Sequence, residues 1–184
     1  VGLTYSHARN EIISMDEPEL KTAYRKREGN PISQYFGLIA EGFVTQADLD
    51  NPDFPVSTFG TVKVGDLKYK DANGDGFIDD RDESRIGYSD IPENTYALSL
   101  GVNYKGWGFS VMFQGVDHVS RYYDAEAMYA FVSGGKVKEH HLERWNPAQS
   151  EAYNLQHANY PLLHYDNYGD HNQRTNSFFL KNGS

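Results

Sequence analysis

Two neighbouring segments of the chain alternate between apolar residues and small or polar ones. In the first segment every second position is apolar: Tyr96, Leu98, Leu100, Val102 and Tyr104. A tight turn at Lys105–Gly108 follows, and the alternation then resumes with three more apolar positions: Phe109, Val111 and Phe113. A period of two places successive side chains on opposite faces of a β-strand. The pattern therefore predicts a β-hairpin over residues 96–116.

Strand-like patterns also occur at both ends of the chain. Val1, Leu3 and Tyr5 alternate with Gly, Thr and Ser, which predicts a strand over residues 1–12. Residues 177–184 begin another apolar segment and are expected to start a further strand. These patterns predict an all-β fold built from antiparallel strands.

The stretches between these strands have weak periodicity and many turn residues. Residues 13–95 and 117–176 are predicted to form two long loops. Within them we expect a short strand at Val62–Tyr69 and a short helix around Asp124–Phe131. Loops of this length usually carry function.

The hairpin is compatible with two settings. Tyr96, Tyr104 and Trp107 fall near the strand ends, where the aromatic girdles of a transmembrane β-barrel meet the bilayer interface. Strands of about nine residues are also long enough to cross a membrane at a tilt. A hairpin of a soluble β-sandwich has the same alternation, so the pattern alone leaves both settings open.

An acidic segment at 71–82 has the spacing of a calcium-binding loop. Calcium takes six to eight oxygen ligands, which a twelve-residue loop supplies from fixed positions. The ligands predicted here are the side chains of Asp71, Asn73, Asp75 and Asp82, the backbone carbonyl of Phe77, and Asp79 through water. Gly76 stands at the sixth position, where the sharp turn favours a residue without a Cβ.

Two observations limit this assignment. Asp82 is shorter than the Glu that usually ends such a loop, and Glu83 is an adjacent substitute. A polar surface turn has a similar composition, although crowding so many carboxylates without a cation is electrostatically costly. No amphipathic helix precedes the loop in the sequence, so we expect structural calcium rather than an EF-hand switch.

Composition excludes several classes of function. The formal net charge of −9 argues against nucleic acid as a partner. Much of this charge is local, because residues 66–93 hold nine acidic and four basic side chains. The absence of cysteine excludes disulfides and thiolate metal sites. Mean hydropathy is −0.68 despite 14 Tyr and 10 Phe, which is typical of β-strands with long polar loops.

No nucleophile motif organises the Ser, His and Asp residues, so we predict that the protein is not an enzyme. The carboxylate pair Glu139 and Glu143 is no evidence for a glycosidase without a measured separation. Five histidines, with no regular ligand spacing, are assigned no metal site: His140, His141, His157, His164 and His171.

Several short motifs together resemble one protein family. They are Tyr5–Asn10, Gly37–Phe43, Gly65–Asp71 running into Asn73–Gly76, Ile86–Tyr88, Tyr104–Gly106, Phe113–Gly115, Arg144–Pro147 and Arg174–Ser184. In combination they resemble the SusC/RagA-like TonB-dependent outer-membrane transporters, and they span essentially the whole chain.

The resemblance implies a transmembrane β-barrel of 22 strands around an amino-terminal plug. This chain is similar to a piece from the carboxy-terminal part of such a barrel, without the plug. Residues 13–95 and 117–176 would then be extracellular loops, and the turn of the hairpin would lie on the periplasmic side. The expected location is the cell outer membrane, in contact with lipid.

The expected function is import of nutrients, most of all oligosaccharides. The implied partners are a SusD-like surface lipoprotein, TonB through the missing amino-terminal part, and an oligosaccharide or peptide substrate. A secreted, calcium-stabilised carbohydrate-binding module is the alternative from a different class. A dockerin-like module is a third reading, but dockerins carry two calcium loops and this sequence has one.

Overall fold

The computed structural model describes residues 1–18, 23–123, 128–132, 135–165 and 171–183. It consists mostly of strands with few helices, so the predicted all-β class is confirmed at this level. The chain divides into two compact units, each described by itself below. The first unit contains residues 1–35, 87–122 and 180–184, and the second contains residues 36–86 and 123–179.

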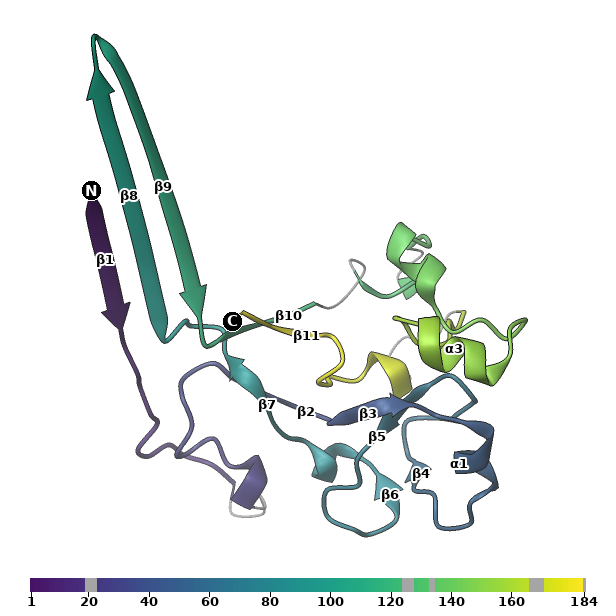
Figure 1. Ribbon diagram of the computed structural model, residues 1–184. Coiled ribbons are helices and arrows are strands. Elements are labelled where there is room, and N and C mark those ends of the chain that lie inside the picture. Colours follow the sequence, from purple (N-terminus) through teal and green to yellow (C-terminus); the bar gives the residue numbers. More distant parts are fainter. Residues whose placement is uncertain (19–22, 124–127, 133–134, 166–170, 184) are drawn as a thin grey trace. The chain divides into compact units, whose positions relative to one another are not determined.

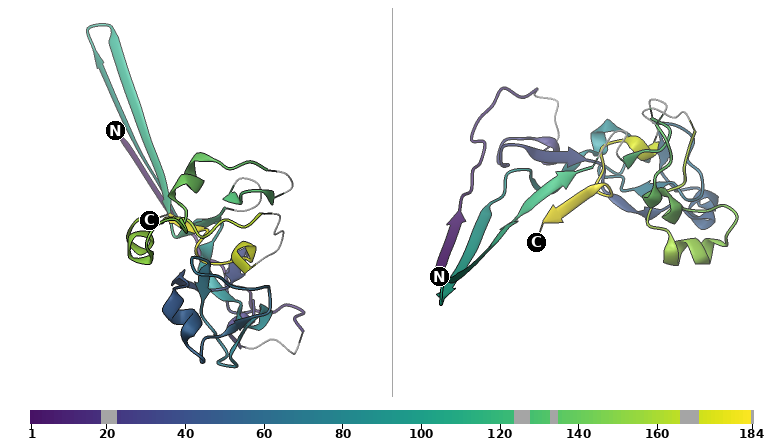
Figure 2. Two further views of the ribbon diagram at one scale, coloured as in Figure 1. Left: turned by 90° about the vertical axis from the view of Figure 1, so that its right-hand side faces the viewer. Right: turned by 90° about the horizontal axis from the view of Figure 1, so that it is seen from above.

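The first unit contains a three-stranded antiparallel sheet in the order β1-β8-β9 (Figure 1). Its strands are β1 (Gly2–His7), β8 (Asn94–Tyr104) and β9 (Trp107–Asp117). The predicted hairpin is confirmed, and it extends slightly beyond 96–116 at both ends. Two further views show β1 running along the hairpin (Figure 2).

The turn of the hairpin is tighter than the sequence suggested. It consists of Lys105 and Gly106, which have φ angles of 46° and 86°. Positive φ at both central residues matches the twist of the flanking strands. Trp107 and Gly108, assigned to the turn from the sequence, are instead the first residues of β9. Trp107 thereby pairs with Tyr104 across the hairpin.

The register places most of the apolar side chains of the three strands on one face of the sheet. Leu98 pairs with Leu3 of β1 and Phe113 of β9, and Leu100 pairs with Val111. We call this surface the apolar face; it consists of Leu3, Tyr5, Tyr96, Leu98, Leu100, Val102, Tyr104, Trp107, Phe109, Val111 and Phe113. Most of these residues are exposed, including Trp107 at 83%, Phe109 at 66% and Phe113 at 59%.

The opposite face of the sheet carries mostly small and polar residues, with Met112 and Val116 as its two large apolar side chains. It includes Thr4, Ser6, Ala97, Ser99, Gly101, Asn103, Ser110, Met112 and Gln114. Between Thr95 and Val116 the single charged side chain is Lys105, at the turn. At the other end of the hairpin, polar side chains gather: the Tyr5 hydroxyl donates to Asn94 Oδ1, and Asn94 Nδ2 donates to Asp117.

Both predicted terminal strands are shorter in the structure. The strand predicted over 1–12 ends at His7, because the chain then bonds to residues 30–32 instead of β8: the Asn10 side chain accepts the Ile32 N–H, and the Ile12 N–H donates to the Asn30 carbonyl. The strand predicted over 177–184 is β11 (Leu180–Gly183), which pairs with β10 (Val119–Tyr122). It starts late because Asn176 Oδ1 accepts the N–H groups of Phe178 and Phe179 and holds a turn there.

The predicted loops contain short elements. Residues 13–95 include β2 (Gln34–Gly37) paired with β7 (Ser84–Ser89), β3 (Ala40–Phe43) paired with β5 (Leu67–Tyr69), and β4 (Val56–Ser57) paired with β6 (Phe77–Ile78). The strand expected over 62–69 is thus confined to β5. The 3-10 helices that lie wholly within the described residues are η1 (Ala23–Arg25), η2 (Asp80–Asp82), η4 (Glu139–Glu143) and η5 (His171–Gln173).

Two α-helices were not anticipated. They are α1 (Gln46–Asp50), which begins with a capping box between Thr45 and Asp48, and α3 (Glu151–His157), capped by Ser150. These caps are the sequence signals that mark the helix starts. The helix expected at 124–131 lies largely outside the described residues. Of the helices in the described part of the chain, none is long and apolar enough to cross a membrane.

An aromatic cluster forms the core of the second unit. The rings of Phe43 and Trp145 lie 5.6 Å apart, and Phe43 and Phe178 lie 5.8 Å apart. Phe179 continues the cluster towards Tyr129 and Tyr160. The contacts of Phe43 with Trp145 and Phe178 join the two segments of the second unit, residues 36–86 and 123–179, which are separated in the sequence by residues 87–122.

A polar network lies beside this core. The buried carboxylate of Asp66 accepts the Lys63 N–H at 2.7 Å and the Asn172 amide at 2.8 Å, and contacts His164 Nε2 at 2.5 Å. Asn172 Oδ1 in turn accepts the Leu67 N–H. His171 is also buried, with one ring nitrogen at Ser57 Oγ and the other at the Leu67 carbonyl. The buried side chains of Asp66, Asn172 and His171 are thus all hydrogen-bonded within the unit.

Gly65 tests the packing of the aromatic core. A Cβ at this position would overlap the indole ring of Trp145, and the backbone has a φ of 93°. Gly60 also has a positive φ, of 144°, but a Cβ there meets nothing within 4 Å. We expect Gly65→Ala to lower the free energy of unfolding by about 1–3 kcal/mol more than Gly60→Ala, because only the former adds a clash to backbone strain. Urea unfolding measures the difference, and equal effects would contradict this packing.

Candidate functional site

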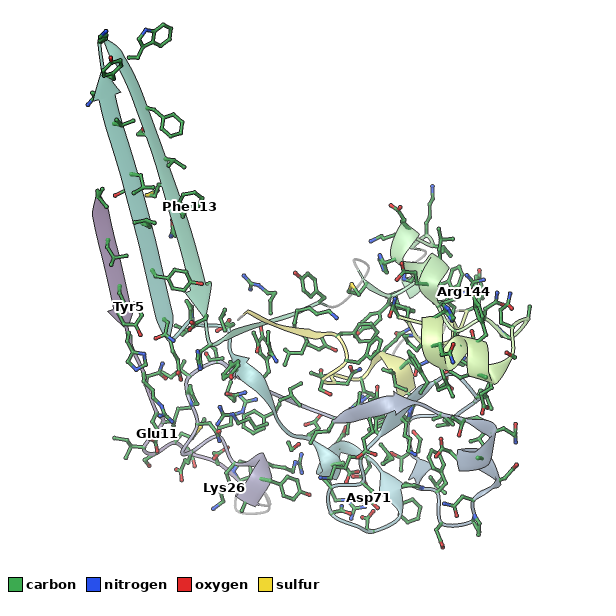
Figure 3. The ribbon with its side chains drawn as sticks, viewed as in Figure 1. Tyr5, Glu11, Lys26, Asp71, Phe113 and Arg144 are labelled. Carbon is green, nitrogen blue, oxygen red and sulfur yellow. The ribbon has the colours of Figure 1, made fainter. Side chains whose placement is uncertain are left out.

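The predicted calcium loop lies between β5 and β7 and contains β6 and η2 (Figure 3, where Asp71 is labelled). Its second half is attached to β4. The Val56 N–H donates to the Gly76 carbonyl at 2.9 Å, and the Thr58 N–H donates to the Ile78 carbonyl at 3.0 Å. Ile78 is buried, with 3% exposure, and anchors the loop in the second unit. In the order of elements the loop is preceded by strand β5 and followed by strand β7, so it is not part of a helix–loop–helix pair.

Two glycines shape the first half of the loop. Gly74 and Gly76 have φ angles of 73° and 81°. A Cβ on either residue would meet nothing within 4 Å, so glycine is favoured here by backbone conformation alone. The expectation of a sharp turn at Gly76 is confirmed.

Three predicted ligands turn their oxygens towards the backbone of this half. Asp71 accepts the N–H groups of Gly74 and Gly76, at 2.7 and 2.8 Å. Asn73 Oδ1 accepts the Asp75 N–H at 2.8 Å, and Asp75 Oδ1 accepts the Phe77 N–H at 3.0 Å. The Asn73 amide also donates to Asp75 Oδ2 at 3.2 Å. The structure therefore brings these three side chains into one compact turn.

Asp82 closes the loop from its other end. Its carboxylate is fully buried and accepts the Ala72 N–H at 2.9 Å and the Asp79 N–H at 2.8 Å, with a longer contact of 3.4 Å from Asn73 N–H. The short Asp side chain thus serves to fasten the two ends of the loop. A Glu would extend one methylene further into this closed space.

Arg81 is the residue that sequence reasoning missed. Its guanidinium bridges Asp75 Oδ2 at 2.8 Å and Asp79 Oδ2 at 2.7 Å. Hydrogen bonding to Asp79, followed by the charges of Asp75 and Asp79, raises the pKa of Arg81. Arg81 is the one basic residue in the acidic segment 71–82, and this was the sequence signal that could have predicted its ion pairs with the carboxylates. Asp79, expected to act through water, is here a partner of Arg81.

The donor set suits a hard cation. Asp71, Asn73 and Asp75 offer oxygens only, which calcium prefers, and Arg81 already supplies positive charge to two of the loop's carboxylates. Within the described ranges, no three His, Cys, Asp or Glu side chains form a group that holds a metal ion by themselves. A calcium site here would also use the Asn73 amide oxygen and the Phe77 carbonyl, as the sequence predicts.

The five histidines form hydrogen bonds within the protein. His141 is fully buried; its Nδ1 accepts the Lys138 N–H at 2.8 Å, so its Nε2 donates to the Met128 carbonyl at 2.8 Å. Burial lowers the pKa of His141 and favours this neutral form. His140 also contacts the Met128 carbonyl, and His157 contacts the Tyr153 carbonyl.

Comparison with known proteins adds no assignment. No protein-family model matches the chain, and no curated protein matches it. The family resemblance described from the sequence motifs therefore enters below as a proposal.

Asp75 is the most informative position for calcium. Asp75→Ala removes one predicted ligand and one partner of Arg81, so we expect calcium binding to be abolished and the loop to loosen. Isothermal calorimetry with calcium chloride measures this. Asp53→Ala, which removes an acidic side chain outside the loop, is the matched control and should leave the affinity unchanged. Wild-type affinity in Asp75→Ala would refute the site.

Arg81 should compete with calcium for the same carboxylate. Arg81→Gln removes the guanidinium from Asp75 and Asp79 while retaining a polar side chain. We expect calcium affinity to rise by about two- to fivefold, because the competing ion pair is exposed and therefore weak. The same calorimetric titration tests this, and weaker binding in Arg81→Gln would mean that the arginine supports the loop instead of competing with calcium.

Proposed function

We propose that this chain forms strands and extracellular loops of a transmembrane β-barrel in a SusC/RagA-like, TonB-dependent outer-membrane transporter. The observation that carries the proposal is the apolar face of the sheet β1-β8-β9. Its side chains are large, exposed and contiguous across three strands. Soluble proteins rarely expose such a surface, whereas lipid covers it in a membrane barrel.

The order of residues along the apolar face matches a bilayer. Tyr5 and Tyr96 pair near one end and Tyr104 and Trp107 pair at the other, as in the two aromatic girdles of membrane barrels. Aliphatic and Phe side chains lie between them. The eight residue steps from Tyr96 to Tyr104 span roughly 26 Å along the strand, close to the apolar band of about 25 Å before tilt is considered.

The remaining features of the sheet support the same setting. Its other face is mostly small and polar, apart from Met112 and Val116, as the interior of a barrel requires. The charged residue Lys105 lies at the turn, and Asp117 lies at the opposite end of the strands. In hydrocarbon every backbone N–H and C=O must be bonded, so the outer edges of β1 and β9 would pair with further strands of the barrel. The apolar face argues against the secreted carbohydrate-binding module.

In this proposal the chain takes part in import of nutrients, most of all oligosaccharides, with a SusD-like lipoprotein as partner and TonB acting through another part of the transporter. No catalytic role is proposed. The acidic loop at 71–82 would hold structural calcium through the side chains of Asp71, Asn73, Asp75 and Asp82 and the backbone carbonyl of Phe77. Calcium, when bound, would offset the repulsion among these carboxylates and keep the loop in one conformation, which lowers the entropy cost of docking a partner.

Two adjacent positions on β8 test the membrane setting. The chain contains no cysteine, so Leu100→Cys and Ser99→Cys introduce single sites for a nitroxide spin label on opposite faces of the strand. In outer-membrane preparations we expect the label at 100 to be relaxed by oxygen, which concentrates in lipid. The label at 99 should be relaxed instead by a water-soluble nickel chelate. Electron paramagnetic resonance measures both.

Each other result would contradict the proposal. If the label at 100 is as accessible to the nickel chelate as the label at 99, the apolar face lies in water. If the label at 100 is protected from both oxygen and nickel, the apolar face is packed against protein, as in a soluble domain.

A further inference from the structure

The second unit contains a small hollow beside α3 that none of the assignments above uses. It has a volume of about 230 Å³. Six residues from η4, from α3 and from the segment between them define its chemistry: Leu142, Glu143, Arg144, Gln149, Tyr153 and His157. Arg144 is labelled near α3 in Figure 3. The volume is below that of pockets for drug-sized ligands, about 300–1,000 Å³, and suits a group the size of one or two rings.

The walls of the hollow are fixed by hydrogen bonds beneath it. Asn154, with 2% exposure, donates to the Asn146 carbonyl at 2.9 Å and accepts the Asn146 N–H at 2.9 Å. This pair ties the segment before α3 to the helix itself. On the other side, the Asn159 N–H donates to the Glu143 carbonyl at 2.8 Å. The hollow is therefore formed before any ligand arrives, which reduces the entropy cost of binding.

A flat aromatic surface forms one side of the hollow. The rings of Tyr153 and His157 are stacked, with centroids 4.2 Å apart and planes 13° apart. Tyr153 is 47% exposed. His157 Nδ1 lies 2.9 Å from the Tyr153 carbonyl; because a carbonyl only accepts, this nitrogen carries the proton and Nε2 is an acceptor in the neutral ring.

Polar groups with spare hydrogen-bonding capacity complete the lining. Among the described residues, the Gln149 side-chain amide has no protein partner. Arg144 uses Nη1 for the His141 carbonyl, and Glu143 uses Oε2 for the Asn159 amide. The remaining nitrogens of Arg144 and Glu143 Oε1 are available. The lining holds one carboxylate and one guanidinium, so these two groups together contribute no net charge.

We propose that this hollow binds a neutral sugar unit of an oligosaccharide. The C–H face of a pyranose ring is apolar and packs on the negative face of an aromatic ring, which Tyr153 supplies. Hydroxyl groups both donate and accept, so a ligand rich in hydroxyls matches a lining that holds a carboxylate, a guanidinium and an amide. A phosphate or other anion would meet Glu143, and a cation would meet Arg144. The lining therefore favours a neutral, hydroxyl-rich ligand.

The inference deepens the proposed function, since it names a substrate-binding site for an importer of oligosaccharides, and it rests on that function for its role in import. Sugar binding at this site does not itself depend on the apolar face. The two proposals can therefore fail separately.

The test uses the complete chain and neutral trisaccharides of glucose, galactose, mannose and xylose as probes. Saturation-transfer NMR detects binding, and calorimetry measures the affinity of whichever trisaccharide binds. We expect Tyr153→Ala to weaken binding by at least about tenfold, which is about 1.4 kcal/mol. Gln149→Ala should weaken it less, and Tyr153→Phe should retain most of the affinity because the ring face is kept.

Leu155→Ala is the matched control. Leu155 lies on the same helix with 52% exposure but does not line the hollow, so its replacement should leave trisaccharide affinity unchanged. If no neutral trisaccharide binds the wild-type chain, or if Tyr153→Ala binds as well as wild type, the site is overturned. Sugar binding together with a water-exposed apolar face would refute only the membrane proposal and favour the secreted binding module.

Discussion

The buried carboxylate of Asp66 is the interaction on which the second unit depends. Its strands are short, with two to four residues each in β3, β4, β5 and β6. Sheet ladders of this length leave many backbone groups without a strand partner, and a buried group without a partner is costly. Asp66 and Asn172 provide the missing acceptors for Lys63 and Leu67. Side chains thus take over part of the role that the backbone plays in the first unit.

The first unit meets the opposite constraint. The backbone groups of β8 are hydrogen-bonded to β1 on one side and to β9 on the other. The side chains of these strands, however, form a large apolar face that no other described residue of this unit covers. An aqueous environment makes such a surface unfavourable, whereas hydrocarbon does not. Within the first unit the hairpin is correspondingly poor in charge, with Lys105 as its one charged residue between Thr95 and Val116.

The acidic loop and the hollow beside α3 are both rigid surfaces made from non-repetitive chain. In the loop, positive φ at Gly74 and Gly76 and the buried Asp82 fix the backbone. In the hollow, Asn154 performs the same task for the segment before α3. In each case a buried polar side chain bonds to backbone groups and leaves other polar groups turned outwards. Such sites combine the variability of loops with the order of a core.

The alternation of residues determined the hairpin and the division of its faces, because a period of two is a local property of an extended chain. The spacing of Asp71, Asn73, Asp75 and Gly76 likewise determined the turn of the acidic loop. Local sequence did not reveal that Arg81 bridges Asp75 and Asp79. It also did not reveal that the Asp82 carboxylate is buried and accepts backbone N–H groups from both ends of the loop. The Asp66–Asn172 network and the aromatic core were decided only by the tertiary structure. Asp66 lies about a hundred residues from Asn172, as Phe43 does from Trp145, and neither periodicity nor spacing carries information over that separation.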